Sequence, residues 1–179
     1  MGGAVSVRSE RPRPPVSMQS VTITQATLDA IPAIVTHRRA MFAAMGYSDN
    51  AALDAMSKAF EPWLRRKMES GEYLAWLAVT PDSSVAAGLG LWLMDWPPHM
   101  IGAGARRGNI LNVFVRPENR RQGIARHLMK VALAWCAANG VDHVMLHSSA
   151  DGRHLYESLG FGPTNEMCLI GGEGAWPGP

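Results

Sequence analysis

The segment from Asn109 to Ala125, NILNVFVRPENRRQGIA, holds the residues best suited to bind a ligand. Its pattern predicts a strand, a short polar turn and the first turn of a helix. The first backbone N–H groups of a helix have no intrahelical partners, and the helix dipole adds about half a positive charge there. Gly123 has no Cβ where a ligand must approach closely, and Arg120 and Arg121 supply positive charge. The junction is therefore predicted to bind a pyrophosphate.

The rest of the chain must form the domain that positions this junction. A chain of 179 residues, 47% of them hydrophobic, is long enough for one domain with a buried core. We expect that domain over residues 21–170. Residues 1–20 are rich in Gly, Ser, Arg and Pro and are expected to be a disordered arm, and residues 171–179 a flexible tail.

Hydrophobic periodicity and turn residues predict the elements of this domain. The expected order is a strand over 21–25, helices over 27–45 and 50–70, strands over 73–80, 85–96 and 109–115, a helix over 124–138, a strand over 144–147, a helix over 152–159 and a strand over 164–170. Thr27 is the expected cap of the first helix, and Arg106 and Arg107 fall in a loop. Residues 144–147 are apolar on both faces, which predicts a central strand. The order β-α-α-β-β-β-α-β-α-β predicts an α+β fold, that is, an α/β three-layer arrangement in which helices flank a mixed central sheet.

The junction and its surroundings resemble the GNAT superfamily of acyl-CoA-dependent N-acetyltransferases. The family signature is Gln or Arg, two residues, Gly, one residue, then Gly or Ala, and it matches Arg120, Gly123 and Ala125. Before it, residues 113–118 (VFVRPE) are similar to the family's fourth strand and the turn that follows. After it, residues 152–161 (GRHLYESLGF) look like the closing helix. The resemblance is close over about 108–169 and general over 21–96, and it implies the GNAT fold.

The resemblance implies acetyl-CoA as co-substrate. Its pantetheine arm would hydrogen-bond the backbone of the fourth strand, and its pyrophosphate would lie on amides at the start of the following helix. The cofactor-binding residues that this implies are Val113, Phe114, Val115, Arg120, Arg121, Gln122, Gly123, Ile124, Ala125 and Arg126. Ser149 either lies near the pantetheine arm or caps the helix that follows it, and both interpretations stay open.

The implied reaction is a direct attack on the thioester, in a ternary complex, by a primary amine of a small molecule or peptide. Tyr156 occupies the position of the family's general acid, and an ordinary tyrosine pKa of about 10 keeps it protonated at neutral pH. The backbone N–H of Val113 is the expected donor to the oxyanion.

The general base stays open, because the expected strand 109–115 contains no carboxylate. Glu61, His147, Asp95, His99 and a chain of water molecules are the alternatives. Asp95, Trp96 and His99 are also the expected acceptor-side residues, because the connection between the third and fourth strands often borders the acceptor site in this family.

Two other functions remain as alternatives. A non-catalytic sensor that binds acyl-CoA could share the fold, and the missing strand carboxylate favours it weakly. A nucleotide-binding protein of Rossmann or P-loop type is disfavoured, because the sequence contains neither G-x-G-x-x-G nor G-x-x-x-x-G-K-[ST].

Composition limits the partners. A net charge of +2 does not predict nucleic-acid binding, and no apolar run approaches the ~18 residues of a membrane span. Cys136 and Cys168 are expected to be free buried thiols, which suits a cytoplasmic protein. His143 and His147 would lie about 13 Å apart on a strand, too far to share one ion, and no metal is expected. Dimers are common in the family, so a homodimer is compatible with the resemblance, but no residue indicates an interface and the oligomeric state stays open.

Overall fold

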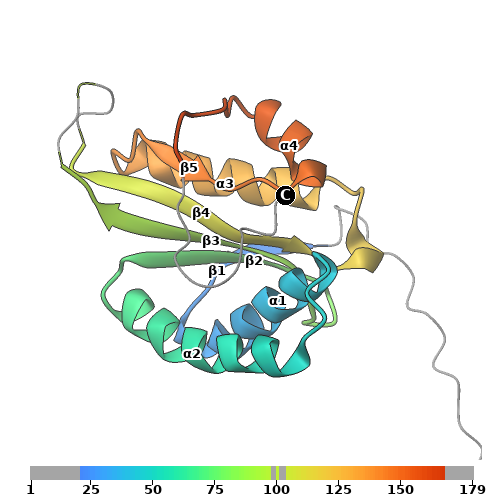
Figure 1. The fold of residues 1–179 in the computed structure, drawn as a ribbon. Coiled ribbons are helices and arrows are strands. Elements are labelled where there is room, and N and C mark those ends of the chain that lie inside the picture. Colours follow the sequence, from blue (N-terminus) through green and yellow to red (C-terminus); the bar gives the residue numbers. More distant parts are fainter. Residues whose placement is uncertain (1–20, 98–99, 101–103, 168–179) are drawn as a thin grey trace, which may run out of the picture.

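The computed structural model describes residues 21–97, 100 and 104–167, which form one sheet between two helical layers (Figure 1). The strand order is β1-β2-β3-β4-β5, with every pair antiparallel except the parallel pair β4–β5. Helices α1 and α2 cover one face, and α3 and α4 cover the other. The elements are β1 (Thr22–Gln25), α1 (Ile31–Ala44), α2 (Asn50–Glu69), β2 (Tyr73–Val79), β3 (Val85–Asp95), β4 (Arg106–Val115), α3 (Ile124–Ala138), β5 (Val144–Leu146) and α4 (Ala150–Glu157). The expected mixed sheet flanked by helices is confirmed.

The first helix starts later than the sequence predicts. A 3₁₀ turn, Leu28–Ala30, precedes α1, and Thr27 makes no capping hydrogen bond through its side chain. Pro32 has no N–H group, so it cannot donate the helical bond to the Leu28 carbonyl. The Ile31 N–H donates to that carbonyl instead, which tightens the first turn. The prediction of Thr27 as a helix cap was therefore wrong.

The second helix and the hairpin follow the prediction. The Asp49 side chain accepts a hydrogen bond from the Ala52 N–H at 3.1 Å, which fixes the start of α2. Gly71, just after its end, has the positive φ of +71° that favours glycine. Between β2 and β3, the Thr80 hydroxyl hydrogen-bonds the Ser84 carbonyl at 2.9 Å and holds the turn.

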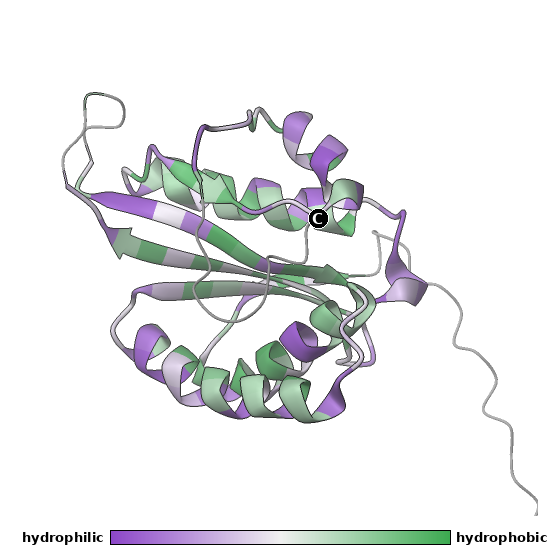
Figure 2. Ribbon diagram, in the orientation of Figure 1, coloured by the Kyte–Doolittle hydropathy of each residue, from purple (hydrophilic) through white to green (hydrophobic). Residues whose placement is uncertain are grey.

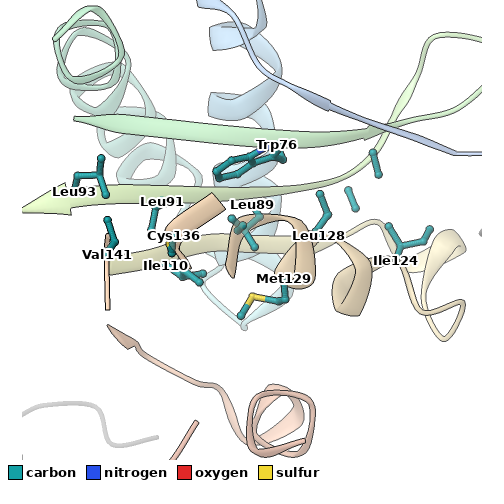
Figure 3. Close-up of a cluster of buried hydrophobic side chains, with 13 residues drawn as sticks. Trp76, Leu89, Leu91, Leu93, Ile110, Ile124, Leu128, Met129, Cys136 and Val141 are labelled. Carbon is teal, nitrogen blue, oxygen red and sulfur yellow. The ribbon is translucent and has the colours of Figure 1, made fainter. Parts of the chain in front are cut away.

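The core on the α3 face joins that helix to the middle of the sheet (Figure 3). Leu128, Met129 and Cys136 of α3 are 0–2% exposed and belong to the same cluster as Leu89 and Leu91 of β3. Burial raises the pKa of the Cys136 thiol to about 11, so the thiol stays protonated at neutral pH. The predicted buried free thiol at this position is confirmed, whereas Cys168 lies outside the described residues.

The core on the α1 and α2 face is separate from the first. Its largest fully buried side chains are Ile31, Leu64 and Tyr73, one from each of α1, α2 and β2. Figure 2 shows hydrophobic residues along the middle of the sheet and hydrophilic residues in α4. No helix in the described part of the chain is long and apolar enough to cross a membrane.

A buried histidine makes this second layer sensitive to pH. His37 of α1 is 4% exposed, and its Nε2–H group donates to the Val85 carbonyl at 3.2 Å. Burial lowers the pKa of His37, the hydrogen bond to Val85 raises it in part, and the charge of Arg116 lowers it further. The net effect is a lower pKa than in the unfolded chain, so His37 is neutral in the fold at pH 7.

We therefore expect the fold to lose stability as the pH falls below the ordinary histidine pKa of about 6.5. Below that pH the unfolded chain binds a proton at His37 more readily than the folded chain, so protonation favours unfolding. The contribution of neutral His37 to the free energy of unfolding is fully present above pH 6.5 and is lost as the pH falls toward the folded-state pKa.

Urea unfolding of wild type and His37→Gln at pH 7.5, 6.5 and 5.5 tests this expectation, and the free energy of unfolding should depend less on pH in the variant. His127→Gln, at an exposed position on α3, is the control and should keep the wild-type slope. Parallel profiles for wild type and His37→Gln would contradict the assignment.

The sheet differs from the prediction at the start of β4. Arg106 and Arg107 belong to the strand rather than to the preceding loop. Asp95 pairs with Arg106, and the Trp96 N–H donates to the Ala105 carbonyl at 2.9 Å. The Arg107 guanidinium lies 4.0 Å from the centroid of the Trp96 ring. Cross-strand pairing with the end of β3 therefore extends β4 toward its N-terminal side.

The sheet also differs at its C-terminal side. β5 was predicted to be central, but among the described strands it lies at the edge, and Val144–Leu146 are only half-buried. The strand predicted over 164–170 does not form over its described part, 164–167, where every residue is exposed. No burial drives strand pairing there, and residues 168–170 lie outside the described residues.

Candidate active site

Strands β4 and β5 separate partway along their length. β5 pairs only with Gly108, Asn109 and Ile110, so β4 continues to Val115 with no β5 partner. Buried backbone N–H and C=O groups require partners, and an opening of this kind needs a ligand or water to supply them. The opening is therefore a candidate binding site that runs along the second half of β4.

A bulge in β4 turns its backbone toward this opening. The β3–β4 register shifts between Gly88 and Gly90, and Asn112 has a φ of +56°. Before the bulge, the Gly108 N–H donates to the His143 carbonyl beside β5. After it, the Arg116 N–H donates to the Ala86 carbonyl, on the β3 side. The extra residue thus reverses the alternation, and the N–H groups of odd-numbered residues, Val113 and Val115, face the opening.

The turn after β4 leads directly into the start of α3. The chain passes through a short 3₁₀ turn, Pro117–Asn119, and then through left-handed conformations at Arg121 (φ +61°) and Gly123 (φ +78°). Gly123 is the N-cap of α3, and no side chain in the described part of the chain caps this helix start. The first amides of α3, those of Ile124, Ala125 and Arg126, therefore have neither intrahelical partners nor a capping side chain. The predicted helix start at this junction is confirmed.

Positive charge surrounds this helix start. Arg120 Nε donates to the Val115 carbonyl at 3.2 Å, and its guanidinium lies 5.9 Å from the centroid of the Phe114 ring. Arg121 is exposed, and Arg126 Nη2 donates to Ser158 Oγ at 2.9 Å. These three arginines form no ion pair within the described ranges. The Oε1 atom of Gln122, in the same turn, is buried without a hydrogen-bond partner there.

Tyr156 lies on the same side of the sheet as α3. It is half-buried on α4, its ring packs edge-on against Phe161 at 6.1 Å between centroids, and Val113 packs against the same core cluster. Burial raises the pKa of Tyr156, so its hydroxyl is protonated at neutral pH. The Ser149 hydroxyl accepts from the Gly152 N–H at 3.3 Å, which confirms Ser149 as the cap of α4.

A second polar group lies on the opposite face of the bulge, and the sequence did not indicate it. Arg38 Nη1 of α1 donates to Asn112 Oδ1 at 2.5 Å, and Asn112 Nδ2 donates to the Tyr73 hydroxyl at 2.9 Å. Burial raises the pKa of Tyr73 to about 12, so Tyr73 stays neutral. A Cβ at Gly90 would overlap the Tyr73 hydroxyl, so that position requires glycine. The signal available in the sequence was an asparagine within the expected strand 109–115 and two glycines, Gly88 and Gly90, within the strand before it.

Two of the expected acceptor-side residues, Asp95 and Trp96, lie away from the opening along β4. Asp95 lines a surface pocket of 280 Å³ together with Ser70, Gly71, Glu72, Leu93 and Arg106. Its partner Arg106 is seven residues before Val113, about 23 Å along an extended strand. The structure therefore brings together β4, the following turn, α3 and α4, but places Asp95 and Trp96 at the far end of the sheet. His99 lies outside the described residues.

Comparisons with known proteins agree with this geometry. Residues 37–161 match the model of the acetyltransferase (GNAT) family. A GCN5-related N-acetyltransferase from Ralstonia eutropha JMP134 is 33% identical and has a TM-score of 0.77, over 84% of this chain and 97% of the other. A predicted acetyltransferase from Clostridium acetobutylicum, solved with acetyl-CoA, is 21% identical with a TM-score of 0.77, over 84% of this chain and 96% of the other.

A more distant similarity extends to glucosamine-6-phosphate N-acetyltransferase from Arabidopsis thaliana, at 14% identity and a TM-score of 0.61, over 84% of this chain and 97% of the other. A comparison with curated protein sequences returns no match. The family match covers more than half of the chain, and the Ralstonia structure exceeds 30% identity. The chain belongs to the GNAT acetyltransferase family, whose members use acetyl-CoA.

Proposed function

We propose that this protein is an N-acetyltransferase that transfers the acetyl group of acetyl-CoA to a primary amine of a small molecule or peptide. The observation that carries the proposal is the opening along β4, which runs from the backbone of Val113 and Val115 to the uncapped start of α3 at Gly123. A ligand with amides at one end and a pyrophosphate at the other fits this arrangement.

Acetyl-CoA binding is proposed to use both ends of the opening. The pantetheine amides would pair with the backbone groups of Val113 and Val115 that face the opening, beside Phe114, while the Val115 carbonyl already accepts from Arg120 Nε. The pyrophosphate would accept hydrogen bonds from the amides of residues 122–126, and Arg120 and Arg121 would add charge. The Clostridium acetobutylicum protein of similar fold binds acetyl-CoA, which supports this choice of ligand.

The proposed reaction is one displacement at the thioester carbon in a ternary complex. The amine nitrogen forms the new bond to the carbonyl carbon, and the Val113 N–H donates to the oxyanion that develops. The carbon–sulfur bond then breaks, and the departing thiolate takes the proton of the Tyr156 hydroxyl. The proton that the amine loses is proposed to leave through water, because the described β4 has Asn109 and Asn112 but no carboxylate.

Thiol release tests this proposal against the sensor alternative. The protein is mixed with acetyl-CoA and a panel of primary amines, and free coenzyme A is measured against a control without amine. The enzyme should release thiol in proportion to the N-acetylated product detected by mass spectrometry. Tight acetyl-CoA binding without amine-dependent release on any acceptor would instead favour the sensor.

A further inference from the structure

We propose that the acceptor amine also carries a carboxylate, and that Arg38 binds it on the α1 and α2 side of the β4 bulge. The inference rests on the proposed function and names the substrate class of that same site. The acceptor would be an amino acid, or a closely related amino-carboxylate, with an apolar side chain.

Arg38 is a half-buried cation without an acidic partner in the described structure. The neighbouring Arg39 behaves as a surface arginine usually does, since its Nε pairs with Asp54 at 2.7 Å. The other ion pairs of the described residues join Lys67 to Glu72 and Arg153 to Glu157. Arg38 instead contacts two aromatic rings, Phe42 at 4.9 Å and Phe60 at 4.6 Å. Its charge is therefore held in place by the fold but is not neutralised by it.

The part of the guanidinium that remains unused matches a carboxylate. Arg38 Nη1 is occupied by Asn112, while its Nε is buried without a hydrogen-bond partner among residues 21–97, 100 and 104–167. The terminal nitrogen Nη1 lies on the Cδ side of the planar group, so Nε and Nη2 form the other edge. That edge presents two parallel N–H donors, the geometry that binds both oxygens of one carboxylate.

An aromatic cluster extends from Phe60, one of the two rings that contact this cation. Trp63 of α2 packs against Phe60, Tyr73 and Trp92, with ring centroids 5.7, 5.8 and 5.4 Å away. Phe60 and Tyr73 are buried in the core, so the partly buried rings of Trp63 and Trp92 are the ones that offer an aromatic surface to the rest of the acceptor. The same face of the sheet carries two more buried atoms without partners among the described residues, a donor at Trp92 Nε1 and an acceptor at Asn109 Oδ1. A ligand with both acceptor and donor groups would satisfy them.

Asn112 connects this group to the proposed reaction centre. Its side chain holds Arg38, and its backbone forms the bulge that turns the next residue, Val113, toward the opening. A carboxylate bound by Arg38 would therefore hold the acceptor next to the strand segment where the thioester is proposed to lie. The cofactor and the acceptor would approach the bulge from opposite sides.

The first test compares acceptors on the wild-type protein and needs no variant. Thiol release from acetyl-CoA is measured with L-phenylalanine, L-phenylalaninamide, phenethylamine, L-leucine, L-leucinamide and phosphoethanolamine. We expect kcat/KM for each amino acid to exceed that of its amide by about 10- to 100-fold, the effect of hydrogen bonds to a charged group. Equal or faster turnover of the amides, or a preference for phosphoethanolamine, would overturn the proposal that Arg38 binds a carboxylate of the acceptor.

The second test removes the two parallel N–H donors of Arg38, called the fork below. Arg38→Gln should raise KM for the preferred amino acid by about 10- to 100-fold, leave KM for acetyl-CoA unchanged and change the amide little. Arg38→Lys keeps the charge without the fork and should recover only part of this loss. Arg39→Gln, one residue along the same helix, is the matched control and should behave as wild type. An equal loss for the amino acid and its amide would mean that Arg38 only supports the bulge, and would overturn the proposal.

The two proposals can fail separately. If the wild type binds acetyl-CoA but releases no thiol with any amine, the proposed function falls. Calorimetry with L-phenylalanine and L-phenylalaninamide on the coenzyme A-loaded protein then decides the inference alone. Binding of the amino acid but not the amide supports the carboxylate site, and binding of neither or of both equally overturns it. If Arg38→Gln does not fold, the wild-type acceptor series still decides.

Discussion

Replacing Gly123 with glutamate should abolish acetyl-CoA binding, with an affinity loss greater than about 100-fold. Gly123 has a φ of +78°, where any residue with a Cβ is strained, and it stands at the uncapped start of α3. The new side chain would fill the space that the pyrophosphate is proposed to occupy, and its carboxylate would repel that group. Isothermal titration calorimetry with acetyl-CoA measures the effect directly.

Gly140→Glu is the matched control for this variant. Gly140 has a similar φ of +69°, follows the opposite end of α3, and a Cβ there would meet nothing within 4 Å. It therefore imposes comparable backbone strain and the same change of charge far from the opening, and it should bind acetyl-CoA normally. Wild-type affinity in Gly123→Glu would refute the placement of the pyrophosphate. A loss in both variants would mean that strain in α3, rather than the site, is responsible.

Replacing Tyr156 with phenylalanine should lower kcat by about 100-fold or more while acetyl-CoA affinity stays within about twofold. The ring keeps its contact with Phe161, so the packing of α4 is preserved and only the hydroxyl is lost. Because burial raises the pKa of Tyr156, the wild type should show no loss of its acid as the pH rises from 7 to 9. Steady-state kinetics over that range, together with calorimetry, separates turnover from binding.

Tyr47→Phe is the control for the hydroxyl. Tyr47 is 51% exposed and packs against Phe42, away from α4. Loss of its hydroxyl should therefore leave both kcat and the affinity for acetyl-CoA unchanged. Unchanged turnover of Tyr156→Phe across the whole pH range would remove Tyr156 from the mechanism. A fall in acetyl-CoA affinity equal to the fall in kcat would make it a binding residue instead.

Local features of the chain were predictable because neighbouring residues determine them. The helix start at Gly123 follows from glycine after two arginines and from the apolar spacing of Ile124 and Leu128, both of which are buried. The hairpin around residues 81–84 and the cap at Asp49 depend on side chains within a few residues. These interactions are short-range, so the sequence alone indicates them.

The missed features depend on contacts between distant segments. Arg38 and Asn112 are 74 residues apart, and only the packing of α1 against β4 brings them together. The bulge at Asn112 depends on its pairing with β3, because an extra residue is defined only relative to a partner strand. The assignment of Asp95 to the acceptor side, made from its neighbours in the chain, stays a prediction. The length of β4 separates Asp95 from Val113, and this distance follows from strand pairing rather than from local sequence.

Because of the inserted residue in β4, the proposed donor site and the proposed acceptor site lie on opposite faces of the sheet and use different parts of the chain. In the proposed function, acetyl-CoA binding depends on main-chain atoms and one helix end, which tolerate wide variation in side chains. In the proposed acceptor site, the choice of acceptor depends on side chains of α1 and α2, which are separate in the chain from residues 113–126. Exchanging those two helices between relatives should therefore redirect the enzyme to a new acceptor without rebuilding its hold on the donor.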